Sequence, residues 1–322
     1  MAAYVLGFFN MKNTGRFNKE NMRAILITSG IFLFFCAFLF NDDTFSKVDV
    51  SQDGASIVLA NIADGDVPLA GKSLEDCQFS TFCWDEAFIG DYEQFLQDCK
   101  SLGVTRIYQC FQKNLLGTDE LHTFLAAMHE AGIEIYWVNG DPSWAVEQLP
   151  DALSYVDAIG EFNEASTEKV DGILFDIEYY CLPDYDAKQE EYNSIALEAY
   201  KTLREEGAIY GLPVGQCVNY QVANANIGEY EQIVSEACDF VAVMAYCNDI
   251  QYQAIKNLLV ICDRYDVPLD VLTYYASEPS DTTRHSLEEG EKEWQIILER
   301  SQSDNLGFCY YDYRDELHEM IK

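Results

Sequence analysis

Eight apolar segments of strand length, each followed by a segment with helical spacing, fill the chain from about residue 78 onward. The expected strands are 79–84, 105–111, 133–138, 171–178, 213–220, 240–246, 269–275 and 307–311. The expected helices are 92–102, 120–131, 144–162, 186–206, 230–237, 251–265, 287–301 and 314–321. Buried strands that alternate with helices form parallel sheets, because each parallel connection has to cross over the sheet. Eight such units in about 240 residues predict a closed (β/α)8 TIM barrel.

An open, doubly wound sheet is the alternative for such an alternation. That fold binds nucleotides through a Gly-rich turn after an early strand, and the sequence contains no such turn. The barrel is therefore the predicted fold for residues 76–322.

Residues 1–75 have a different character. Residues 1–23 are basic, and an apolar run at 24–40, about 17 residues long, reaches the lower end of what spans a bilayer as a helix. We expect a cytoplasmic N-terminus at 1–23, a transmembrane signal anchor at 24–40 and an acidic stalk at 41–75. This arrangement predicts a single-pass plasma-membrane protein with its barrel outside. Secretion after signal cleavage is the alternative, but Phe38–Asn41 lacks the small residues of a cleavage site.

The charge and the metal-binding residue types exclude several functions. The chain has 20 Lys and Arg against 55 Asp and Glu, a formal net charge of -35, which disfavours nucleic-acid binding. The four histidines form no ligand-like set with the eleven cysteines, so no metal or other cofactor is predicted. Exported proteins often contain disulfides, but these cysteines show no scaffold spacing and several lie in expected strands.

Two carboxylates stand at the end of the fourth expected strand. Strand alternation places Asp176 and Glu178 on one face, with their Cα atoms roughly 6 to 7 Å apart. Two such acids beside an apolar strand are costly to ionise together, so one should keep its proton to an unusually high pH. A carboxylic acid with such a raised pKa can act as a general acid at neutral pH. The alternative is a pair of solvated acids just beyond a strand.

Amide, acidic and aromatic residues follow most of the other expected strands. The carboxyl ends of the strands form the site of a TIM barrel, and aromatic faces with amides and acids are typical of sugar binding. A glycan is therefore the predicted partner. The predicted substrate-binding residues are Trp84, Asn139, Asp141, Trp144, Gln216, Asn219, Met244, Asn248, Tyr274 and Tyr311.

At these positions the sequence resembles the family 18 glycoside hydrolases, the chitinases and endo-β-N-acetylglucosaminidases. Their fourth strand carries Asp-Gly-x-Asp-x-Asp-x-Glu, and Asp171–Glu178 matches four of its five fixed positions. Their sixth strand ends in Met-x-Tyr, which Met244–Tyr246 matches, and Gly307 with Tyr311 stands where the eighth strand has Gly and Trp.

The resemblance implies a set of roles. Glu178 is the acid that protonates the leaving oxygen, and Asp176 orients the N-acetyl group of the substrate, whose carbonyl oxygen attacks the anomeric carbon. Tyr246 is the third catalytic residue and bonds to the acetamido group, while Tyr311 forms the floor of the subsite. This substrate assistance is an exception to the scheme that uses two carboxylates.

The chain departs from the family at two further places. Leu174 stands where the family has its middle Asp, and Val138–Asp141 replaces a Ser-x-Gly-Gly segment. Three hypotheses follow: a membrane-anchored extracellular glycoside hydrolase for N-acetylhexosamine-containing glycans, a carbohydrate-binding barrel without catalysis, and a glycosidase that uses Glu178 with a second carboxylate. For that second carboxylate the candidates are Asp141, Asp249 and Asp312.

Overall fold

The computed structural model describes residues 73–247, 251–276, 284–301, 305–313 and 315–321. These residues belong to one compact unit of the chain. The predicted cytoplasmic and membrane segments, 1–23 and 24–40, lie outside the described residues and stay predictions, as does nearly all of the stalk. Within the described part of the chain, no helix combines the length and the apolarity needed to cross a bilayer.

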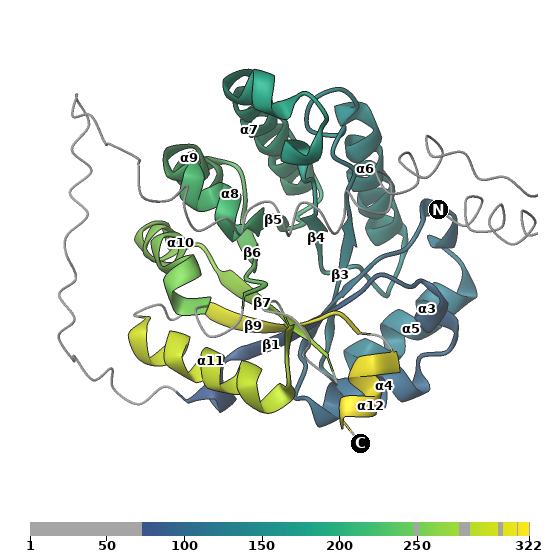
Figure 1. The fold of residues 1–322 in the computed structure, drawn as a ribbon. Helices are drawn as coiled ribbons and strands as arrows, with labels where there is room; N and C mark the ends of the chain where they lie inside the picture. Colours follow the sequence, from purple (N-terminus) through teal and green to yellow (C-terminus); the bar gives the residue numbers. More distant parts are fainter. Residues whose placement is uncertain (1–72, 248–250, 277–283, 302–304, 314, 322) are drawn as a thin grey trace, which may run out of the picture. The chain divides into compact units, whose positions relative to one another are not determined.

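Eight parallel strands close into a barrel (Figure 1). They are β1 (Gln78–Cys83), β2 (Arg106–Gln109), β3 (Glu134–Asn139), β4 (Gly172–Phe175), β5 (Val214–Asn219), β6 (Phe240–Met244), β7 (Leu269–Tyr275) and β9 (Leu306–Tyr311). Neighbours pair in chain order, and β9 lies between β7 and β1 and closes the ring. The predicted (β/α)8 barrel is confirmed. A two-residue strand, β8 (Arg284–His285), pairs with the end of β7.

Helices surround the barrel and follow the predicted order (Figure 1). The longer ones are α4 (Glu93–Ser101), α5 (Asp119–Glu130), α6 (Leu149–Ala165), α7 (Tyr185–Ile209), α9 (Ile227–Glu236), α10 (Gln251–Tyr265), α11 (Leu287–Arg300) and α12 (Asp315–Ile321). Side-chain caps fix two of their starts: Thr118 accepts a hydrogen bond from the N–H of Leu121, and Ser286 forms a capping box with Glu289.

Two differences from the expected helices have local causes. Helix α6 begins at Leu149 rather than near Trp144, because the carbonyl oxygen of Ser143 accepts three main-chain hydrogen bonds in a turn and Pro150 suits a first helical turn. A short extra helix, α8 (Tyr220–Ala225), starts directly after β5. The side chain of Asn219 caps it by accepting hydrogen bonds from the main-chain N–H groups of Gln221 and Val222.

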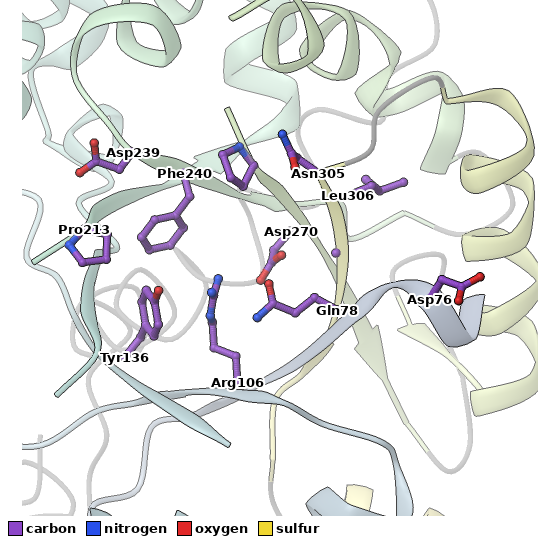
Figure 2. A pocket seen from close by; sticks show the side chains of 12 residues that line it. Asp76, Gln78, Arg106, Tyr136, Pro213, Asp239, Phe240, Asp270, Asn305 and Leu306 are labelled. Atoms are coloured by element: carbon purple, nitrogen blue, oxygen red, sulfur yellow. The ribbon is translucent and has the colours of Figure 1, made fainter. Parts of the chain in front are cut away.

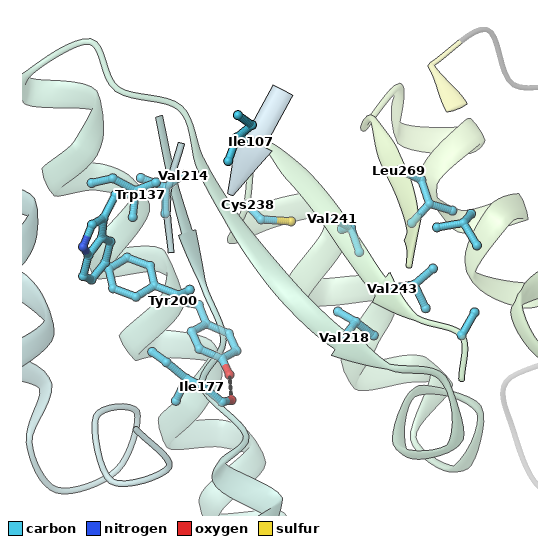
Figure 3. Packing of buried hydrophobic residues seen from close by; sticks show 14 of the residues in the cluster. Ile107, Trp137, Ile177, Tyr200, Val214, Val218, Cys238, Val241, Val243 and Leu269 are labelled. Carbon is cyan, nitrogen blue, oxygen red and sulfur yellow. Dashed lines mark hydrogen bonds between the residues drawn. The ribbon is translucent and has the colours of Figure 1, made fainter. Parts of the chain in front are cut away.

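Strand alternation divides the buried side chains into two clusters. The larger cluster lies between strands and helices, and Figure 3 shows Val214, Val218 and Val241 within it. There the hydroxyl group of Tyr200 donates a hydrogen bond to the carbonyl oxygen of Ile177 at 2.9 Å (Figure 3). The smaller cluster fills the barrel interior and includes Leu174. The interior is therefore a packed core, and the site has to lie at one of its ends.

Candidate active site

Strand β4 delivers Asp176 and Glu178 to the carboxyl end of the barrel. Leu174 faces the barrel interior. Because side chains alternate along an extended chain, Asp176 and Glu178 point to the same side as Leu174. The main-chain N–H of Asp176 donates to the carbonyl oxygen of Asn139 at 3.0 Å, which continues the pairing with β3 past Phe175. Glu178 then precedes a short 3-10 turn, η3 (Tyr179–Cys181), which ends the extended backbone at the mouth of the barrel.

Gly140 allows the chain after β3 to approach β4 at this point. A Cβ atom at position 140 would lie 1.7 Å from the main-chain oxygen of Asp176, far inside van der Waals contact. Any other residue would push the backbone of Asp176 away, so this glycine has a packing role beside the candidate site.

Asp176 is a carboxylate in an unfavourable environment. It is partly buried, and its Oδ1 is inaccessible to solvent and has no hydrogen-bond partner. Burial and the charge of Glu178 raise the pKa of Asp176 to about 7, and a hydrogen bond with Cys217 opposes the rise. The sequence-based expectation of one acid that holds its proton therefore has a physical cause in the structure.

Glu178 has a different neighbour. The hydroxyl group of Tyr180 donates a hydrogen bond to its Oε1. Burial raises the pKa of Glu178, while the bond from Tyr180 works in the opposite direction. Both acids that follow β4 are thus biased toward the protonated form.

An aromatic wall, made of Trp84, Tyr246, Tyr274 and Tyr311, stands at the same end of the barrel. The ring of Tyr246 lies 4.9 Å from that of Tyr311 and 5.8 Å from that of Tyr274, measured between centroids. Trp84 donates its indole N–H to the hydroxyl oxygen of Tyr311 at 3.2 Å. Electrostatic coupling of Asp176 to Tyr246 and Tyr311 places the wall next to the acids.

The hydroxyl group of Tyr246 is the second buried polar group of the site without a hydrogen bond of normal geometry, although it lies near enough to the hydroxyl group of Tyr311 to oppose the rise in the pKa of that phenol. Burial raises the pKa of the Tyr246 phenol well above its usual value, so it remains a donor at neutral pH. Met244 precedes Tyr246 by two residues, at the end of β6, and its side chain packs in the barrel interior.

Two predicted substrate-binding residues, Trp144 and Gln216, lie outside the barrel interior. Trp144 is buried against Tyr155 and Phe175 in the outer cluster. Gln216 is 1% exposed and sits between outward-facing valines, so it points away from the barrel interior.

Three predicted polar residues of the site bond to the local backbone. Asn139 accepts from the N–H of Gly140 at 2.8 Å, and Asn219 caps α8. Asp141 is exposed and accepts from the N–H of Ser143 at 2.8 Å. The predicted Asn248 lies outside the described residues.

Two neighbours of the acids were not among the predicted site residues. Tyr180 follows Glu178 by two positions and could have been proposed from that spacing. Cys217 faces Asp176 because it is interior on β5, directly beside β4. A thiol among apolar residues carries no signal of this kind in the sequence.

The first acid of the predicted motif is structural. Asp171 accepts a hydrogen bond from the N–H of Ile135 at 2.7 Å, and its Oδ2 lies 3.0 Å from Nε2 of His129. The other ring nitrogen of His129 lies 3.1 Å from Glu168. Asp171 therefore ties the beginning of β4 to β3 and α5, at the end of the barrel opposite to Glu178.

A cavity of about 360 Å³ opens at that opposite, amino end of the strands (Figure 2). Figure 2 shows Arg106 beside Tyr136 and Gln78, with Asp270 across from it. The guanidinium group lies 4.1 Å from the centroid of the Tyr136 ring and donates to Glu134 at 2.8 Å.

Asp270 occupies the interior at this amino end. It accepts hydrogen bonds from the hydroxyl groups of Tyr108 at 2.5 Å and Ser80 at 3.0 Å. Residues at the amino end of a TIM barrel serve stability rather than chemistry, so the candidate site is the carboxyl end.

No protein-family model and no curated protein sequence matches this chain. Solved structures do. A GH18 chitinase from Pseudoalteromonas aurantia is similar over 76% of this chain and 97% of its own, with a TM-score of 0.56 and 12% identity. A putative alpha-L-fucosidase from Bacteroides thetaiotaomicron is similar over 77% and 91%, with a TM-score of 0.53 and 12% identity. At such identity the likeness shows a shared barrel fold, and function has to be argued from the site.

Proposed function

We propose that this protein is a glycoside hydrolase for N-acetylhexosamine-containing glycans that uses substrate-assisted acid catalysis. The supporting observation is the pair of unpartnered buried groups at the carboxyl end. Asp176 presents an acceptor at Oδ1, and Tyr246 presents a donor. A secondary amide carries one N–H and one carbonyl oxygen, so an N-acetyl group would satisfy both and remove the cost of leaving them unpaired.

Each residue then has a definite role. Protonated Glu178 transfers its proton to the glycosidic oxygen as the bond from that oxygen to the anomeric carbon breaks. The acetamido carbonyl oxygen forms the new bond to that carbon and gives a cyclic oxazolinium ion, while Asp176 holds the amide N–H and Tyr246 the oxygen. Glu178, now a carboxylate, takes a proton from the water that opens the ring.

The aromatic wall supplies the apolar contact for the sugar ring. Tyr311 forms the floor of the subsite, and Trp84 fixes its hydroxyl group. A phenol offers less stacking area than the indole that the resembling family has at this position, so we infer weaker binding of each sugar unit.

The experiment compares wild type with Glu178→Gln on chito-oligosaccharides, with release of reducing ends as the readout. Because general acid catalysis contributes roughly 10²- to 10⁴-fold, the variant should lose at least about a hundredfold in rate. Glu147→Gln is the matched control, since Glu147 is an exposed acid of the same rim. Equal rates in wild type and Glu178→Gln would refute the assignment of the acid.

A non-catalytic carbohydrate-binding barrel is the second candidate. Leu174, which is fully buried, favours it because the residue cannot exchange a proton with Asp176. Calorimetric titration of the same oligosaccharides separates the two functions. Binding without turnover, equal in wild type and Glu178→Gln, would support the second candidate.

A further inference from the structure

Tyr180 is held within reach of Glu178 by the backbone between them. The N–H of Cys181 donates to the carbonyl oxygen of Glu178 at 2.8 Å, and the N–H of Leu182 donates to that of Tyr179 at 3.1 Å. These two bonds form the turn η3, and within it the hydroxyl group of Tyr180 donates to Oε1 of Glu178. The contact is thus built into the turn that follows the acid.

The ring of Tyr180 is fixed as well. It packs edge to face against Tyr179, with 5.9 Å between centroids. Tyr179 is itself anchored, because its hydroxyl group donates to Asn193 at 3.1 Å. Burial raises the pKa of Tyr180 well above its usual value, so the hydroxyl group keeps the proton that it donates.

We propose that Tyr180 is a positioning residue for Glu178, which occupies Oε1 and thereby confines the transferable proton of the acid to Oε2. The proposal rests on the proposed glycosidase function. The same hydrogen bond stabilises the carboxylate that remains after proton transfer, because hydrogen bonds to an ionised acceptor are stronger than those to a neutral one.

Leu174 explains why such a partner matters in this chain. The residue cannot share a proton with Asp176 or Glu178, so Tyr180 is the hydrogen-bonding group that orients Glu178 from its own turn. Other titratable groups act on Glu178 or Tyr180 through space. They are Asp176 just after β4, Cys181 of η3, Tyr200 of α7, Cys217 of β5 and Tyr230 of α9.

Tyr180→Phe removes the hydroxyl group and keeps the ring. We expect the titration of Glu178, followed by carbon NMR of its labelled carboxyl group, to move upward by about one pH unit, because the carboxylate loses its donor. Tyr210→Phe is the matched control, since it removes a hydroxyl group that bonds to Asp157 at 3.3 Å at the far end of α7, and it should leave the titration in place.

Turnover supplies the second readout. With an active wild type, the upper limit of the pH profile of Tyr180→Phe should move upward with the titration, and kcat should fall about tenfold while KM stays the same. An unchanged titration in folded Tyr180→Phe would overturn the proposal. If wild type shows no turnover, the proposed function fails, while the NMR titration still decides whether Tyr180 controls the acid.

A second variant covers the case in which Tyr180→Phe does not fold. Glu178→Gln keeps Tyr180 and removes the negative charge that raises the pKa of its phenol. The phenol, observed by NMR of labelled tyrosine, should then ionise at lower pH than in wild type. An unchanged phenol titration would show that the two groups do not interact and would overturn the proposal.

Discussion

Asp176→Asn should make the protein more stable at alkaline pH. The pKa of Asp176 is raised from 3.8 to about 7 in the folded protein, so the folded state binds more protons than the unfolded chain within this window. Stability therefore falls as pH rises through it. A difference of about 3 units at about 1.4 kcal/mol each gives an upper value of about 4 kcal/mol. Since solvent reaches part of the side chain, we expect a gain of about 2 to 4 kcal/mol for the amide at pH 8.

Urea unfolding of both proteins between pH 4 and pH 8 measures this gain. Near pH 4 the wild-type acid is protonated in the folded protein and only partly ionised in the unfolded chain, so the two unfolding free energies should differ by less than about 1 kcal/mol. They should separate progressively above that pH, with the variant more stable. A difference that stays constant with pH, or a wild type that is the more stable protein at pH 8, would refute the reasoning about burial.

Two further predictions concern residues outside the candidate site. The hydrogen bond with Asp171, together with that to Glu168, raises the pKa of His129, so its contribution to stability is complete below about pH 6.5 and is lost as pH rises through the raised value. His129→Gln should lower the unfolding free energy, measured with urea, by about 1 kcal/mol at pH 5.5 and by almost nothing at pH 9. An equal loss at both pH values would contradict this. Gln216→Leu should raise the unfolding free energy by about 1 kcal/mol, because neither amide atom of the buried side chain has a partner. A loss of stability would show that the amide makes a bond in solution.

The barrel could be predicted from the sequence because its signals are local. Each buried strand is a short apolar run and each helix has its own spacing, so all eight strands overlap their expected ranges. A helix boundary departs from its expected position where local hydrogen bonds compete with the helix, as those of Asp141 and Ser143 do ahead of α6.

The candidate site was predictable only in part. Alternation along β4 places Asp176 and Glu178 together without any tertiary information. The direction of Gln216 depends on where β5 sits in register with β4, and the packing of Trp144 depends on helix α6. Such positions follow from pairing and packing between distant segments, which residue types at strand ends do not reveal.

The cysteines have a consequence for the handling of this protein. No disulfide joins the ten cysteines in the described part of the chain, and burial raises the pKa of several of them, including Cys83, Cys238 and Cys247, to about 12. The thiolate is the species that reacts with oxidants and alkylating agents, so the buried thiols with a raised pKa react slowly at neutral pH. Packing and hydrogen bonds hold the barrel together, without a disulfide among its described residues. It can be produced and studied in reducing buffer, and exposure to air should alter it slowly.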